Sequence, residues 1–278
     1  MTLPREEYVE QAYLFRTLCE RFSDGIPMQD LLMQVHHEML ATTKLPMAIS
    51  FLATELKHRG VMAVGMQQLS HYFSPWQAFL VSESESDRGR FDTNMALRIL
   101  QGEAEYRSTS ENPQGIFFYQ FEAMCRNRLN YDRGLKAMSE DAGYDPDWRE
   151  WILVVRRQLG LVDLADLIYG RSEAFVEYRR SRLGNDWTPL DYAMLFGEKE
   201  GRIAFANRRK DILYLFAAMQ RHLGYPAVPR PVVVVNPVDQ IPQLHRRLER
   251  LESRIQIMEE ERRQGIDISK FYGQPGLP

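Results

Sequence analysis

The stretch YVEQAYLFRTLCERF, residues 8–22, repeats its apolar side chains with a helical period. Tyr8, Ala12, Phe15, Cys19 and Phe22 follow one another at alternating steps of four and three residues. This spacing places all five on one stripe of an α-helix. The stretch therefore predicts an amphipathic helix, and similar periodicity in most of the following segments, as far as residue 223, predicts an all-α, multi-helix globular body.

Several helix starts are marked by a capping side chain followed by proline, whose missing N–H costs nothing in the first turn. Residues 74–77, SPWQ, also fit a capping box, Asp145-Pro146 and Thr188-Pro189 repeat the device, and Leu45-Pro46 lacks the polar cap. We predict helices at residues 5–23, 28–43, 46–59, 75–107, 114–130, 146–159, 161–182, 189–196 and 198–223. Because residues 82–90, SESESDRGR, are polar and contain glycine, two helices with a break near Gly89 are an alternative to one at 75–107.

The composition is that of an ordinary folded protein: 44% of the 278 residues are apolar and 26% are charged, with a formal net charge of −3. This balance argues against nucleic-acid binding through bulk electrostatics. The N-terminus is charged from Arg5 onward, and no window approaches the roughly 18 apolar residues of a membrane span. Cys19 and Cys125 lie within amphipathic patterns without ligand spacing, which predicts buried, reduced thiols in a cytoplasmic protein.

The composition changes at residues 225–242, YPAVPRPVVVVNPVDQIP, where five prolines surround four consecutive valines. Proline excludes a helix here and favours an extended chain. We therefore predict a helical globular domain at 1–225, a proline-rich linker at 226–240, a coiled coil at 241–264 and a flexible tail at 265–278. The four valines could also form a short strand, which would need a partner edge in the body or in another subunit.

The predicted coiled coil has an apolar seam with a heptad period. Its a and d positions are Ile241, Leu244, Leu248, Leu251, Ile255 and Met258. Arg247 and Arg254 occupy g positions, and the e positions five residues later are Glu252 and Glu259, a pairing that favours parallel chains. RLERLE (247–252) and RIQIME (254–259) resemble the Arg-h-x-x-h-Glu pattern of short trimeric coiled coils. A parallel homotrimer is therefore favoured, a dimer is the alternative, and a helix folded back onto the body is the competing interpretation.

Residues 198–211, EKEGRIAFANRRKD, interleave cations with acidic side chains. They predict a salt-bridge network or, alternatively, an anion site made of Arg202, Arg208, Arg209 and Lys210. Glu55 and His58 have the spacing of half a di-iron motif, with His36 and His37 on the preceding predicted helix. Because the chain contains no second Glu-x-x-His pair, we predict solvated or hydrogen-bonded polar residues here and no metal site.

The sequence contains no nucleophile elbow, glycine-rich phosphate loop or zinc-protease motif, so it predicts neither an enzyme nor a bound cofactor. Our functional hypothesis is an adaptor, scaffold or structural subunit whose partner is first a second copy of itself. Phe271 and Tyr272 of the tail form a candidate docking peptide for another protein. The alternative is a nucleic-acid-associated regulator that uses the segment from Arg202 to Lys210, and a metal-dependent enzyme in the helical body is the weakest alternative.

Overall fold

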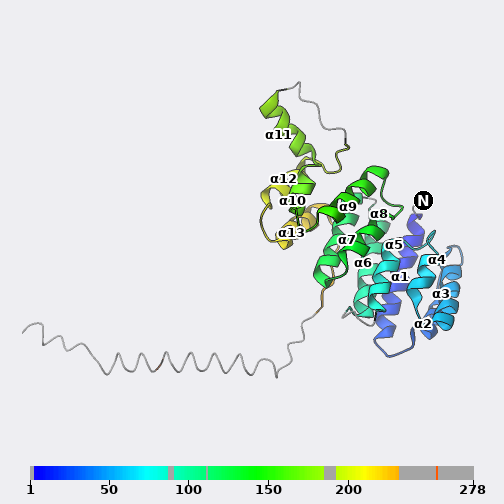
Figure 1. The fold of residues 1–278 in the computed structure, drawn as a ribbon. Helices are drawn as coiled ribbons and strands as arrows, with labels where there is room; N and C mark the ends of the chain where they lie inside the picture. Colours follow the sequence, from blue (N-terminus) through cyan, green and yellow to red (C-terminus); the bar gives the residue numbers. More distant parts are fainter. Residues whose placement is uncertain (1–2, 87–90, 111, 185–191, 232–254, 256–278) are drawn as a thin grey trace, which may run out of the picture. The chain divides into compact units, whose positions relative to one another are not determined.

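The computed structural model describes residues 3–86, 91–110, 112–184, 192–231 and 255 (Figure 1). Within these ranges the chain forms thirteen α-helices and no β-strand, which confirms the all-α class. No helix among them is long and apolar enough to cross a lipid bilayer. The helices are α1 (Arg5–Phe22), α2 (Met28–His36), α3 (Leu45–Arg59), α4 (Met62–Gln68), α5 (Pro75–Ser84), α6 (Thr93–Thr109), α7 (Pro113–Asn127), α8 (Tyr131–Ser139), α9 (Pro146–Gln158), α10 (Leu164–Tyr169), α11 (Glu173–Leu183), α12 (Glu198–Ala206) and α13 (Ile212–Leu223).

Four predicted helices, those at α1, α3, α7 and α9, are confirmed to within a few residues at each end. The capping box is confirmed as well: the Gln77 amide donates to Ser74 Oγ at 3.2 Å, and the Ser74 amide donates to Gln77 Oε1 at 3.1 Å. Asp145 caps α9 by accepting the Trp148 amide at 2.8 Å. The pair Thr188-Pro189 lies outside the described residues.

The longest predicted helices are wrong in their extent, because internal capping groups divide them. The stretch 75–107 forms two helices, which confirms the alternative of two helices with a break near Gly89. Asp92 caps the second helix by accepting the Met95 amide. The stretch 161–182 is α10 and α11, since Ser172 caps a new helix start. The stretch 198–223 is α12 and α13, because Arg209 takes a left-handed φ of 59° and Asp211 caps α13. Local polar side chains thus compete with helix continuation.

Three further predictions differ from the structure. Helix α2 ends at His36 and not at residue 43. Residues 192–197 are not helical, because the Leu195 and Phe196 amides both donate to the Arg171 carbonyl, at 2.9 and 3.1 Å. The short helices α4 and α8 were not predicted; each spans few turns, which leaves little periodicity to detect.

The helices pack mainly against their neighbours in the chain, while α1 lies along α6 and α7 lies between α6, α8 and α13. Figure 1 shows α1 to α6 on one side of α7 and α10 to α13 on the other. Helix α7 contributes buried rings to an aromatic cluster in the core. The cluster contains Phe117, Phe118, Phe121, Trp148, Trp151 and Phe196.

One compact unit runs from the N-terminus to Pro231. Beyond α13, Tyr225 and Val228 are buried, and the Asn127 side chain donates to the Pro229 carbonyl at 3.1 Å. Residues 226–231, which open the predicted linker, therefore pack against the helical body. The rest of the linker, the coiled coil apart from Ile255, and the tail lie outside the described residues.

Candidate functional site

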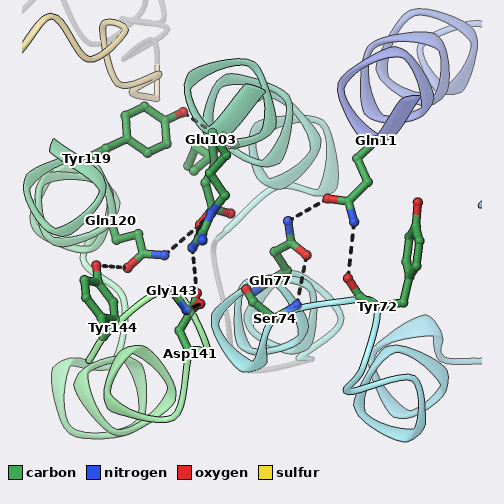
Figure 2. Close-up of polar contacts among 12 residues, drawn as sticks. Gln11, Tyr72, Ser74, Gln77, Glu103, Tyr119, Gln120, Asp141, Gly143 and Tyr144 are labelled. Atoms are coloured by element: carbon green, nitrogen blue, oxygen red, sulfur yellow. Dashed lines mark hydrogen bonds and ion pairs between the residues drawn. The ribbon is translucent and has the colours of Figure 1, made fainter. Parts of the chain in front are cut away.

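A buried ionic cluster links α6 to the loop that follows α8. Arg107 lies one helical turn after Glu103, and its Nε and Nη2 donate to Glu103 Oε1 at 3.1 and 2.8 Å. Nη2 also donates to Asp141 Oδ2 at 2.6 Å. The three side chains are almost fully buried, so one guanidinium holds two carboxylates away from water (Figure 2). Such a cluster strongly constrains the elements that supply it, because none of its charges can be left alone in the interior.

A shell of neutral polar groups surrounds the ionic cluster. The side chain of Gln120, on α7, donates through Nε2 to Glu103 Oε1 at 2.6 Å. The Tyr144 hydroxyl donates to Gln120 Oε1 at 2.9 Å. The Gly143 amide donates to Asp141 Oδ1 at 2.8 Å. Helices α6 and α7 and the loop at 140–144 are therefore joined by one continuous hydrogen-bond network.

Burial and neighbouring charge shift the protonation of this cluster. Burial raises the pKa of Glu103 above its usual value, Arg107 opposes this rise, and Asp141 adds to it. Burial alone would lower the pKa of Arg107, but Asp141 and Glu103 hold that pKa well above its ordinary value. Arg107 is therefore permanently charged, and Glu103 is the carboxyl group of the cluster whose neutral form burial favours.

A cleft of about 270 Å³ opens beside Arg107. Leu3 and Tyr8 line it from the N-terminal segment, His71 and Tyr72 from the loop before α5, and Gly143 from the loop after α8. A second network supports its other wall: Gln11 on α1 donates to the Tyr72 carbonyl at 3.3 Å and accepts from Gln77 Nε2 at 3.2 Å. Figure 2 shows this network and the ionic cluster on either side of Ser74.

The described part of the chain offers this cleft no recognisable catalytic pair. The Tyr72 hydroxyl donates to the buried Glu7 carboxylate at 2.8 Å. Burial is the main cause that raises the pKa of Tyr72 far above its normal range, and the nearby Glu7 carboxylate is the second. Asp141 is bound by Arg107 and Gly143. These groups hold the walls of the cleft together, and the arrangement suits binding better than proton transfer.

The candidate anion-site residues lie around α12 and the turn after it. Arg202 pairs with Glu198 and, at 3.7 Å, with Glu177. Arg208 binds Asp166 at 3.2 Å and lies over the Phe205 ring. The Arg209 amide donates to Asp163 at 2.7 Å, while the side chains of Arg209 and Lys210 are exposed. Carboxylates of the same chain thus bind two of the four cationic side chains.

Of the predicted association residues, the structure describes Ile255 alone, which is helical and 50% exposed. The others lie outside the described residues, namely Ile241, Leu244, Arg247, Leu248, Leu251, Glu252, Arg254, Met258 and Glu259.

Two of the residues that were considered as metal ligands, His36 and Glu55, contact other groups of the chain. His36 Nδ1 lies 3.0 Å from the Pro46 carbonyl, and Glu55 pairs with Arg59 at 2.8 Å. Across the described ranges, no group of three or more His, Cys, Asp or Glu side chains could hold a metal ion. Cys19 is buried and Cys125 half-buried; both are thiols, and burial raises the pKa of Cys125 to about 11.

Sequence reasoning missed Glu103, Arg107 and Asp141. Glu103 and Arg107 continue the buried stripe of α6 that includes Ile99, so charged residues stand where the helical period calls for apolar ones. That position was the available signal. Asp141 gave none, because only the tertiary fold brings it to Arg107. Comparison of the chain with protein-family models, with curated proteins and with solved structures gave no match.

Proposed function

We propose that the chain is a homo-oligomeric helical adaptor or structural subunit, assembled through a parallel coiled coil at residues 241–264. The helical body supplies a rigid platform, because buried polar networks fasten its helices to one another. The tail at 265–278, with Phe271 and Tyr272, is the candidate docking segment for another protein. The trimer remains the favoured state and the dimer the alternative.

The placement of arginines relative to glutamates carries this proposal. In the described residues, four arginines follow a glutamate by four positions and bind it: Arg59, Arg107, Arg126 and Arg202. Arg247 and Arg254 have no acidic residue three or four positions away on either side. On a helix they would have no carboxylate neighbour of their own. A parallel neighbouring chain supplies one to each, from its e positions.

The apolar seam supports the same proposal. A seam of six apolar side chains at a and d, flanked almost entirely by Arg, Glu and Gln, is typical of a helix that buries one narrow stripe against copies of itself. Ile255, at one of the a positions, is half exposed in the single chain. An apolar helical side chain in this setting favours a partner helix.

Multi-angle light scattering tests the proposal. The full chain has a mass of 32.6 kDa, and we expect about three times this mass in solution. Deletion of residues 241–264 should give a monomer that keeps the helical circular dichroism of the body and loses only the contribution of the deleted helix. A monomeric full chain at micromolar concentration would exclude the oligomer, and a dimer would exclude the trimer alone.

The nucleic-acid alternative rests on the exposed side chains of Arg209 and Lys210. Arg202 and Arg208 contribute little to it, because each is bound by a carboxylate of the same chain. A gel-shift assay compares the full chain with the variant Arg209→Ala/Lys210→Ala over a series of salt concentrations. Salt-sensitive binding that this variant loses would favour the alternative over the adaptor.

A further inference from the structure

Arg107 has a donor that the ionic cluster does not use. Its Nε and Nη2 bind the two carboxylates, whereas Nη1 donates to none of the residues that the structure describes. The residue is only 7% exposed. Nη1 is not among the fully buried unpartnered atoms, so it is reachable from outside, and because arginine cannot lose its proton this donor still calls for an acceptor.

The position of Gly143 shows where this nitrogen points. A Cβ built on Gly143 would lie 2.9 Å from Arg107 Nη1, and both residues line the 270 Å³ cleft. Nη1 therefore lies at the cleft wall, next to a residue whose missing side chain leaves room for an approaching atom. The glycine at this position keeps the nitrogen accessible from the cleft.

The other groups in the cleft limit the kind of ligand that fits. Tyr8 and His71 provide accessible rings, and Glu140, whose carboxylate lies 4.0 Å from Lys136 Nζ, adds a half-exposed carboxylate. Arg107 already balances two carboxylates, Glu103 and Asp141, so a third negative charge at Nη1 would be repelled. A neutral oxygen acceptor avoids this repulsion and still satisfies the donor.

We propose that this cleft binds a planar, neutral amide whose carbonyl oxygen accepts a hydrogen bond from Arg107 Nη1. The amide N–H groups face the carboxylate of Glu140, and the flat part of the ligand lies against the aromatic walls. A small number of placed polar groups among rings is the usual composition of a small-molecule site. This inference does not depend on the oligomeric state of the chain.

Benzamide and benzoate are matched probes, because they share a ring and differ in charge. Ligand-observed NMR titration of the full chain should show millimolar binding of benzamide and at least about tenfold weaker binding of benzoate. The variant Gly143→Ala places a methyl group against Nη1 and should weaken benzamide about tenfold or more. Gly170→Ala is the matched control, since its Cβ would meet only ordinary contacts at 3.4 Å and beyond.

A second variant covers the case in which Gly143→Ala disturbs folding. Glu140 is 55% exposed, so Glu140→Ala should fold normally, and it should weaken benzamide roughly threefold by removing the acceptor for its N–H. Absence of benzamide binding to the wild-type chain would overturn the proposal. Benzoate binding as tightly as benzamide, or unchanged benzamide affinity in both cleft variants, would overturn it equally.

Discussion

The arginines of the helical body and those of residues 241–264 differ in where their carboxylates lie. Arg107 binds Glu103, one turn earlier on its own helix, and Asp141 in the loop after α8. All three side chains are buried. Arg247 and Arg254 have no acidic residue three or four positions away in the sequence, and we propose that their partners belong to another chain. On this proposal, the arginine of the body pairs within its own chain, and the arginines of residues 241–264 pair between chains.

Removal of Arg107 should have the largest effect on the body. Arg107→Leu leaves two buried carboxylates without their cation, and breaking a buried pair in this way costs about 3–5 kcal/mol. We expect a correspondingly lower free energy of unfolding by urea denaturation monitored with circular dichroism. A variant as stable as the wild type would show that the cluster does not fasten α6 to the loop at 140–144.

Loss of the Tyr225 hydroxyl should have a smaller effect. This hydroxyl donates to Glu122 Oε2 at 2.8 Å and joins the segment after α13 to α7. Tyr225→Phe leaves a buried carboxylate oxygen without its donor, for which we expect a loss of about 1–3 kcal/mol in unfolding free energy. Tyr214→Phe is the control, because Tyr214 is 64% exposed and should tolerate the change. Equal stability of the two variants would contradict the packing of residues 225–231 against the body.

The pH dependence of stability should reflect Glu85, whose carboxylate accepts the Met62 and Ala63 amides. Burial raises its pKa above 4.5, and the two amides only partly oppose this rise. The folded state therefore binds the Glu85 proton more tightly than the unfolded state does. The contribution of this proton to the free energy of unfolding is complete below pH 4.5 and is lost as the pH rises through the folded-state pKa. Urea midpoints measured from pH 4 to 7 should fall less steeply in Glu85→Gln than in the wild type. Identical slopes would contradict the raised pKa.

The exposed pair of Arg156 and Asp132 should matter least. Its two hydrogen bonds, at 2.7 and 2.8 Å, are as short as those of Arg107. Solvent screens this pair, however, and ordering two long side chains offsets most of the attraction. We expect Arg156→Ala to unfold at the wild-type urea midpoint within experimental error. A loss as large as that of Arg107→Leu would remove burial as the explanation of the difference between the two arginines.

Helical period and capping chemistry were enough to predict the fold class, because both are local properties of the chain. The Ser74 capping box is an example, since its two partners lie three residues apart. The break at Arg209 was missed because a left-handed residue between two periodic segments leaves the periodicity almost intact. The ionic cluster was missed because Glu103 and Arg107 have the same spacing as the exposed pair Glu198 and Arg202. The apolar stripe of α6 that includes Ile99 distinguishes the buried pair, whereas its contact with Asp141 depends on packing of distant segments.

The most direct test of the proposed assembly is a charge exchange measured by sedimentation velocity. One variant carries Arg247→Glu and Arg254→Glu, and the other carries Glu252→Arg and Glu259→Arg. Each alone sets like charges opposite one another in a parallel coil, so both should dissociate at concentrations where the wild type is assembled. An equal mixture should regain association, because both g–e′ contacts of a mixed dimer, and two of the three interfaces of a mixed trimer, then pair opposite charges. If each variant alone keeps the wild-type sedimentation coefficient, the partners of these arginines do not lie in a parallel neighbouring chain.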